Sequence, residues 1–267
     1  AITGGEPFLH RQQVLAFVRR AKELYPGVHV RIYTSGDLLD DTLLDDLRAA
    51  GLDELRFSVK PAETDGDQEQ LFERMAAAVA VLPDVMVEMP VIPGTLDEMK
   101  RLLRTLDNLG VRGINLLEFC FPMGSWDEFE KRGFAVKTPP LPVLYNYGYA
   151  GGLPIEGSEL LCLELLEYAL DEGLSLGVHY CSLENKHRDQ VCQQNRACAV
   201  GGVYEQDPDD FLLKTAKVFD GDVAVVRERF EALGASFAID ADDGSLQCHP
   251  DRLEDVADLD VLPALSY

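Results

Sequence analysis

The chain has 267 residues, of which 46% are apolar and 8% aromatic, so it can bury one substantial core. Acidic residues outnumber basic ones by 47 to 24, and the resulting net charge of −23 argues against attraction to a nucleic acid backbone. Because there is also no membrane-spanning apolar run and no signal-like start, we expect a cytoplasmic protein without nucleic acid or membrane partners. The acidic surplus, with Arg exceeding Lys, fits a protein adapted to high salt or an ordinary acidic cytosolic protein.

The first seven residues, AITGGEP, are typical of a strand that ends in a turn. The adjacent residues Gly4 and Gly5 leave backbone groups bare, so a ligand can approach the main chain closely. Glu6 adds a carboxylate beside them. These groups suit the ammonium of a small zwitterionic ligand, although an ordinary structural turn would have the same residues.

Strands and helices then alternate along the chain. Apolar periodicity predicts helices over residues 12–25, 40–50, 67–82, 96–109 and 158–172, and strands over 28–33, 54–60, 85–92, 113–119 and 174–180. The early strands start at intervals of roughly 30 residues, which indicates a repeated unit. This alternation predicts a parallel sheet with right-handed crossovers, either an open doubly wound sheet or a full or partial barrel.

One face of the strand over 54–60 is polar, with Arg56, Ser58 and Lys60 at alternate positions, and Glu88 lies on the next strand. In a barrel these side chains would line the interior, where buried charges need partners or a ligand. The alternative is that Arg56 and Lys60 extend outward from strand ends and have no chemical role. The carboxyl ends of the strands carry turn and polar residues, and this edge is where parallel α/β folds place their sites.

The alternation stops between residues 120 and 154, a proline-rich excursion in which 139–152 is predicted as a hairpin or loop that covers the site, or as a plain surface hairpin. From about residue 208 the elements shorten. We predict a strand over 211–219, a helix over 223–233, a hairpin from 236–240 and 246–249, and a helix over 251–257. The expected organisation is a partial barrel with a cysteine-containing segment over 1–205, and a small α+β domain over 206–267.

Several landmarks, taken in order, resemble the radical S-adenosylmethionine (radical SAM) enzymes over roughly residues 1–119. TGGEPFL at 3–9 resembles the glycine-rich motif after the second barrel strand, and YTSG at 33–36 resembles the end of the next strand. RFSVK at 56–60 and PVIPG at 90–94 are similar to the two strands that follow, the latter to those of glycyl-radical activating enzymes. NLLEF at 115–119, with RGF at 132–134 and HYCS at 179–182, resembles a branch related to pyruvate formate-lyase activating enzyme.

The resemblance implies an α/β fold, namely a partial (βα)6-type radical SAM barrel that lacks its first strand, with a small C-terminal α+β appendage. In the family the glycine motif contacts the methionine amino group of SAM, and the later strand ends reach its carboxylate or ribose. Carried over to this chain, the implied SAM-binding residues are Gly4, Gly5, Glu6, Pro7, Thr34, Ser35, Ser58, Lys60, Glu88, Pro90, Ile92, Asn115 and Glu118. No catalytic residue is assigned.

One departure from the family pattern concerns the radical-generating [4Fe-4S] cluster. The family's Cys-x3-Cys-x2-Cys loop precedes the glycine motif, and no stretch of this sequence has that spacing. We expect the chain to be the C-terminal part of a longer protein, or alternatively a barrel that has lost its cluster, and not to cleave SAM alone.

In a complete enzyme the resemblance implies electron donation from the reduced cluster to SAM, after reduction by a partner such as ferredoxin or flavodoxin. The 5′-deoxyadenosyl radical that is released would abstract hydrogen from an unknown small-molecule or protein or peptide substrate.

Three cysteines, Cys181, Cys192 and Cys198, follow the spacing Cys-x10-Cys-x5-Cys. Their thiolates could hold an auxiliary iron–sulfur cluster or a zinc ion, with His179 or His187 as a fourth ligand. The alternative is a solvated helix with incidental cysteines. The remaining cysteines fit a structural role, Cys120 and Cys162 as small buried hydrophobic residues and Cys248 in the small domain.

Two other functions compete with a radical SAM enzyme. The first is a (βα)-barrel lyase or aldolase in which Lys60, at a strand end, forms a Schiff base. The second is a non-catalytic binding relative that keeps the fold without the chemistry. SAM binding would favour the radical SAM hypothesis, whereas borohydride trapping of Lys60 would favour the lyase.

Overall fold

The computed structural model describes residues 1–59, 65–122, 124–140, 152–187, 193, 201–206 and 213–266. The chain folds into two compact units, Ala1–Leu183 and Glu184–Tyr267. This division falls before the boundary between 205 and 206 that we predicted from the sequence. None of the helices in the described ranges is both long and apolar enough to cross a membrane.

The first unit is built on a five-stranded parallel sheet in the order β1-β2-β3-β4-β5. Its strands are β1 (Arg31–Thr34), β2 (Glu54–Phe57), β3 (Asp84–Val91), β4 (Gly113–Glu118) and β5 (Gly177–Cys181). Ile2 forms an isolated parallel bridge with Ile32, at the edge of β1 that faces away from β2. The predicted α/β class with a parallel sheet is therefore confirmed.

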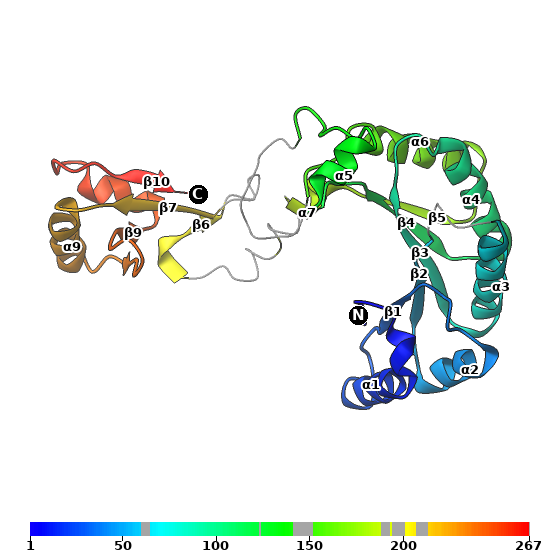
Figure 1. The fold of residues 1–267 in the computed structure, drawn as a ribbon. Helices are drawn as coiled ribbons and strands as arrows, with labels where there is room; N and C mark the ends of the chain where they lie inside the picture. The colour runs from blue at the N-terminus through cyan, green and yellow to red at the C-terminus, as the bar shows by residue number, and fades with distance from the viewer. Residues whose placement is uncertain are drawn as a thin grey trace. The chain divides into compact units, whose positions relative to one another are not determined.

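Five longer helices of this unit are α1 (Arg11–Leu24), α2 (Asp41–Ala50), α3 (Asp65–Val81), α4 (Leu96–Leu109) and α6 (Ser158–Asp171). Helices α2, α3, α4 and α6 follow the outer side of the curved sheet (Figure 1). Gly51 and Gly110 end α2 and α4 in the left-handed conformation, with φ of +85° and +74°, which glycine adopts without steric cost. The predicted helices are thus confirmed, with ends shifted by few residues.

Alternation along each strand sorts the side chains between two faces. Ile32, Leu55, Phe57, Val87 and Ile114 are fully buried toward the helices. Burying each such side chain contributes about 1.5–3 kcal/mol. The intervening positions carry polar or aromatic side chains on the opposite, inner face: Tyr33, Arg56, Glu88, Asn115 and His179.

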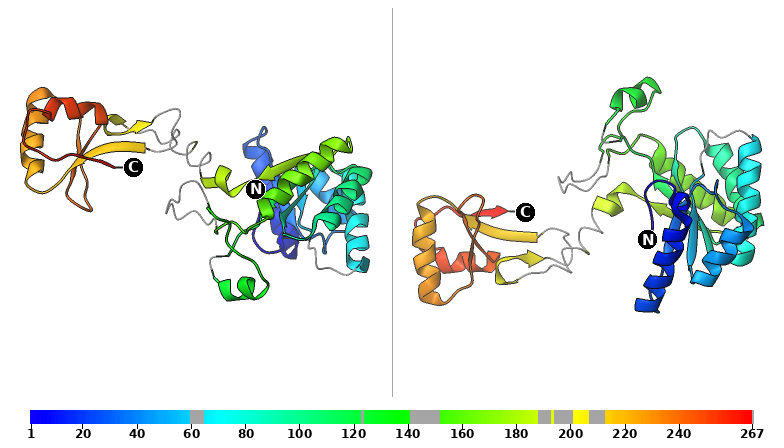
Figure 2. Two further views of the ribbon diagram at one scale, coloured as in Figure 1. Left: turned by 90° about the horizontal axis from the view of Figure 1, so that it is seen from above. Right: turned by 60° about the horizontal axis from the view of Figure 1, so that its bottom comes forward.

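The excursion after β4 contains a short helix, α5 (Trp126–Lys131), that we did not predict. In both views of Figure 2 this green helix stands away from the sheet. Aromatic rings hold it together: Trp126 lies 4.7 Å from Phe121 between ring centroids, and Phe129 lies 5.7 Å from Phe121. The Trp126 indole also donates a 2.7 Å hydrogen bond to the carbonyl of Pro122. Most of the loop predicted over 139–152 lies outside the described residues.

The second unit is a small antiparallel sheet with one main helix. The strands β7 (Leu213–Val218), β8 (Ala238–Ile239), β9 (Leu246–Cys248) and β10 (Ala264–Ser266) are ordered β10-β7-β9-β8. The helix α9 (Asp222–Leu233) covers a core around Phe230 and Leu246. The predicted hairpin is confirmed as the β8–β9 pair, whereas the predicted helix over 251–257 is instead a 3-10 helix, η3 (Pro250–Val256).

Residues 201–206 belong with this second unit. The strand β6 (Glu205–Gln206) pairs with β7, and the 3-10 helix η2 (Gly201–Val203) lies against β9. These pairings explain why the division between the units comes earlier than predicted. The short helix α7 (Leu183–His187) lies at the division itself.

Candidate functional site

The Gly4–Gly5 turn presents open backbone at the carboxyl edge of the sheet. Gly4 has φ of +118°, a conformation that strains any L-residue with a side chain. A Cβ atom added at Gly4 or at Gly5 would meet no atom within 4 Å. Open space therefore adjoins these peptide groups.

The Glu6 carboxylate fastens this turn to the end of β1. It accepts hydrogen bonds from the Thr34 hydroxyl at 2.9 Å, the Ser35 N–H at 2.8 Å and the Ser35 hydroxyl at 3.0 Å. The N–H of Phe8 donates to it at 3.1 Å, which caps the 3-10 helix η1 (Pro7–His10). Glu6 thus has a structural task besides any contact with a ligand.

A pocket of about 470 Å³ opens beside the turn. Its lining consists of Gly4, Gly5, Glu6, Tyr33, Thr34, Ser35, Ser58, Glu88, Pro90 and Leu117. All but Tyr33 and Leu117 were among the predicted SAM-binding residues. Tyr33 and Leu117 share the inner face with Arg56 and Asn115, so strand alternation could have identified them.

The charge in this pocket favours a cation. Two carboxylates, Glu6 and Glu88, contribute to the lining, whereas no Lys or Arg side chain does so within the described part of the chain. Glu88 shares the cation of Arg56 with Glu54, and an ammonium or sulfonium group would compensate the negative charge that remains. Lys60, one of the residues predicted to reach the carboxylate or ribose of SAM, lies outside the described residues.

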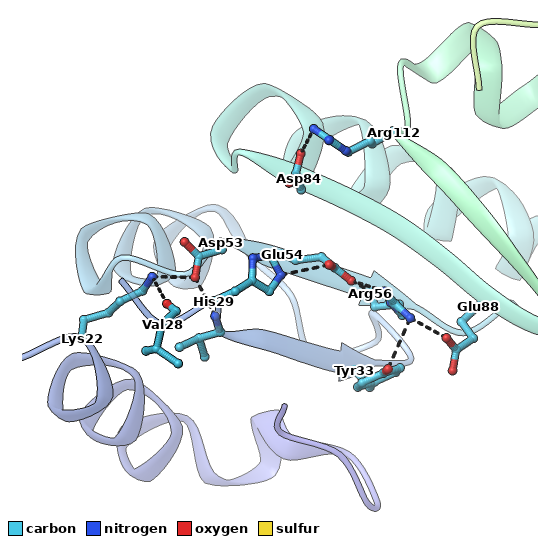
Figure 3. Close-up of polar contacts among 11 residues, drawn as sticks. Lys22, Val28, His29, Tyr33, Asp53, Glu54, Arg56, Asp84, Glu88 and Arg112 are labelled. Carbon is cyan, nitrogen blue, oxygen red and sulfur yellow. Dashed lines mark hydrogen bonds and ion pairs between the residues drawn. The ribbon is translucent and has the colours of Figure 1, made fainter. Parts of the chain in front are cut away.

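Beside the pocket, Arg56 forms a buried ion-pair network across three strands (Figure 3). Its guanidinium donates to Glu54 at 2.7 Å and to Glu88 at 2.5 Å, and its Cζ lies 5.2 Å from the ring centroid of Tyr33. Burial acts to lower the pKa of Arg56, but the bonds to Glu88 and Glu54 raise it above its usual value. With 7% exposure, Arg56 does not extend outward, so the alternative interpretation is wrong for this residue.

The network continues in both directions along the inner face. Asn115 donates from Nδ2 to Glu88 at 2.8 Å, and its Oδ1 contacts Nδ1 of His179 on β5. At the other end, His29 Nε2 lies 3.1 Å from Glu54. Asn115 therefore touches a residue that lines the pocket but is not itself in the lining.

Glu118 lies on the opposite face of β4, because it alternates with Leu117. It is 5% exposed and accepts hydrogen bonds at Oε2 from the Tyr180 hydroxyl at 3.1 Å and the Leu183 N–H at 2.7 Å. Burial, followed by the nearby Glu118 carboxylate, raises the pKa of Tyr180. The structure thus places Glu118 where it fastens β5 and the following turn to β4.

Two further predicted residues stand apart from the pocket lining. Pro7 begins η1, and Ile92 follows β3, where its carbonyl accepts a 2.7 Å hydrogen bond from the Thr95 hydroxyl. Both therefore have structural contacts at the edge of the site. Neither is brought into the described lining.

Only one of the three cysteines predicted to bind a metal lies in the described part of the chain. Cys181 is half-buried at the end of β5, next to Leu117 in the sheet register, whereas Cys192 and Cys198 lie outside the described residues. Among the residues that are described, no cluster of three His, Cys, Asp or Glu side chains could hold a metal ion. Cys162 is buried as predicted, while Cys120 is only half-buried.

Comparison with known proteins shows which proteins the chain resembles. Residues 1–106 match the model of the radical SAM superfamily. The chain is also 27% identical over 264 residues to a Methanocaldococcus jannaschii protein named "Putative glycyl-radical enzyme activating enzyme". That alignment covers 96% of this chain and 66% of the relative, so the chain spans about two thirds of the relative's length. The resemblance to radical SAM proteins of the activating-enzyme branch is thereby confirmed.

Proposed function

We propose that this radical SAM chain binds S-adenosylmethionine in the pocket beside Gly4 and Gly5, as part of an enzyme that activates a glycyl-radical protein. The observation that carries the proposal is the convergence of bare backbone and two carboxylates at one edge of a parallel sheet. The match to the superfamily over residues 1–106 and the name of the relative support it.

The residues present fit SAM chemically. SAM carries a cationic ammonium and a cationic sulfonium, which suit the carboxylates of Glu6 and Glu88 and the open carbonyls of the glycine turn. The hydroxyl of Ser58 offers a donor for the carboxylate of SAM, and Lys60 would add a charge there. The volume of about 470 Å³ is within the range of roughly 300–1,000 Å³ that is usual for small-molecule sites.

Within such an enzyme, the chain's own residues would bind and orient SAM. The bound SAM supplies a hydrogen-abstracting radical when a reduced [4Fe-4S] cluster is at hand, and the family carries that cluster's cysteines ahead of the glycine motif. The inner face of the sheet, with its charge-paired Arg56 network, would form the wall of the substrate side. We propose a protein substrate, a one-electron donor such as ferredoxin or flavodoxin, and a cytoplasmic setting.

SAM binding tests the proposal directly. We would titrate the 267-residue chain with SAM by calorimetry and compare two glycine variants, Gly5→Val and Gly27→Val. A Cβ atom at either glycine meets no atom within 4 Å, so we expect both variants to fold, but only Gly5 adjoins the pocket. We expect Gly5→Val to weaken binding at least tenfold and Gly27→Val to leave it unchanged. Equal affinities of Gly5→Val and the unchanged chain would refute the assignment.

An auxiliary metal site at Cys181, Cys192 and Cys198 is a separate part of the proposal. It would be tested by anaerobic reconstitution with iron and sulfide, followed by metal counting and EPR. The triple Ala variant should lose the bound iron, whereas Cys162→Ala, which removes a buried thiol of the core, should retain it. Full iron and sulfide content in the triple variant would exclude these ligands.

A further inference from the structure

A row of four polar side chains crosses the inner face of the sheet, namely Arg56, Glu88, Asn115 and His179. The donors and acceptors in this polar row can be assigned from one end. The row begins at Arg56, whose guanidinium can only donate, and passes to the ionised Glu88, which can only accept. The bonds from Arg56 and from Asn115 both end on the same oxygen, Glu88 Oε2. Because Glu88 supplies no proton, the group of Asn115 that faces it must be the NH2 group.

This assignment settles the orientation of the Asn115 amide and with it the protonation of His179. With its NH2 group committed to Glu88, Asn115 turns its carbonyl oxygen Oδ1 toward Nδ1 of His179. A carbonyl oxygen can only accept, so Nδ1 must carry the proton. In a neutral imidazole the other nitrogen, Nε2, then has a free lone pair.

The open nitrogen belongs to the same face of the sheet as the pocket. His179 pairs in register with Asn115, and Cys181, two residues on, pairs with the pocket residue Leu117. The other end of the row, Glu88, itself lines the pocket. His179 is exposed, unlike the buried Arg56 that starts the row. A ligand that extends from the pocket across β4 would therefore meet this imidazole.

We propose that His179 presents a hydrogen-bond acceptor on this inner face, with its Nδ1–H tautomer fixed by Arg56, Glu88 and Asn115. Its Nε2 would accept a hydrogen bond from a ligand group that has a hydrogen to donate, such as a hydroxyl, an ammonium or an amide N–H. Asn115 and Glu88 are positioning residues, since they act through His179. The proposal does not depend on SAM binding, because it concerns a different strand and a different chemical group.

NMR spectroscopy of histidine nitrogens tests the tautomer. The chain contains five histidines, so long-range ¹H–¹⁵N spectra of histidine-labelled protein with a metal chelator can be assigned with the aid of His179→Gln. At a pH where the ring is neutral, we expect His179 to show a protonated Nδ1 and an unprotonated Nε2. A predominant Nε2–H form of His179 in the unchanged chain would overturn the proposal without any variant.

Three substitutions, one of them a control, show whether the row causes the tautomer. Asn115→Leu removes the acceptor, so the His179 signal should shift toward the Nε2–H form that predominates in free imidazole side chains. Asn108→Leu, which changes an exposed asparagine of α4, should leave the signal unchanged. Glu88→Gln should also retain the Nδ1–H form, because one amide oxygen can still accept both bonds. An unaltered tautomer in a folded Asn115→Leu variant would contradict the role of the row.

Chemical modification measures whether Nε2 is open to an incoming group. Diethyl pyrocarbonate reacts with unprotonated imidazole nitrogens, and mass spectrometry with NMR locates the product. We expect modification of His179 at Nε2, at a rate at least comparable with that of the exposed His10. Protection of His179 while His10 reacts, or reaction at Nδ1, would show that the face does not offer this acceptor.

Discussion

The backbone N–H of Ser35 donates a 2.8 Å hydrogen bond to the Glu6 carboxylate, which is 29 residues earlier in the chain. The same oxygen accepts from the Ser35 hydroxyl, and the other oxygen accepts from the N–H of Phe8. Each carboxylate oxygen thus accepts from one backbone N–H, a group that can act only as a donor. An amide cannot replace this carboxylate without loss, because in either orientation its NH2 group meets a backbone donor.

We therefore expect Glu6→Gln to lower the free energy of unfolding of the first unit by about 1–3 kcal/mol, the usual cost of leaving a buried donor without an acceptor. SAM affinity should fall as well, since the turn would lose its fixed position. Urea titrations followed by circular dichroism, together with calorimetry, measure both effects. Glu23→Gln, which alters an exposed surface pair with Arg20, is the control. Unchanged SAM affinity in Glu6→Gln would count against the assignment of the glycine motif.

Replacing Arg56 by Leu should be far more costly than removing an exposed arginine. The substitution leaves the carboxylates of Glu54 and Glu88 without their shared cation, and the loss of one partner of a buried pair typically costs about 3–5 kcal/mol. Arg48→Leu on the surface of α2 is the matched control, because its pair with Asp45 is exposed. Urea unfolding of both variants gives the comparison. Equal losses would mean that the inner-face network contributes little to stability.

The described cysteines should differ sharply in reactivity. Burial, followed by the charge of Glu118, raises the pKa of Cys162 to about 12, and burial raises the pKa of Cys248 to about 11. At pH 8 only about one Cys162 thiol in ten thousand is then ionised, and the thiolate is the reactive form. Alkylation with iodoacetamide and peptide mapping should therefore label the half-buried Cys120 and Cys181 first. Labelling of Cys162 as fast as Cys181 would contradict this order.

The contribution of Asp53 to stability should depend on pH. Burial acts to raise its pKa, but the 2.6 Å bonds from Lys22 and from the N–H of Val30 bring the pKa below its usual value. Because the folded-state pKa is the lower one, the stabilisation is complete above the unfolded-state pKa of about 3.9 and is lost as the pH falls through the folded-state value. Asp53→Asn should thus destabilise the first unit at pH 7 and much less at pH 3.

We expect the difference at pH 7 to be on the order of 1 kcal/mol, reduced by solvent screening because the side chain is 32% exposed. Urea titrations of the original chain and the variant at both pH values provide the measurement. Asp45→Asn, at an exposed position of α2, should show little effect at either pH. A loss that is the same at pH 3 and pH 7 would mean that the charge of Asp53 does not cause the stabilisation.

Much of the first unit could be predicted from local sequence. Gly51 and Gly110 mark two helix ends where the backbone needs a positive φ, and apolar periodicity locates the helices before them. The helix α5 escaped prediction because six residues are too few to show a helical period, and its stability comes from aromatic contacts such as Trp126 with Phe121.

The site residues were predictable where they lie at the end of a strand. They were less predictable where their role depends on which face of the sheet the side chain occupies. Gly5, Ser35 and Pro90 converge because parallel strands end at the same edge. Glu118 also ends its strand, but alternation turns it to the opposite face, where it bonds to Tyr180. The stacking of Arg56 on Tyr33 joins residues far apart in the chain, so no local pattern could indicate it.

The position of Trp126 has a practical consequence for optical measurements. It is the sole tryptophan of the chain, and it lies in α5 with its ring against Phe121 rather than in the core of the sheet. Tryptophan emission will therefore report the separation of this aromatic cluster, whether the cluster comes apart by itself or together with the first unit. A fluorescence melting curve and a far-ultraviolet dichroism curve of the same sample need not coincide, and their separation would measure how independently the excursion after β4 comes apart.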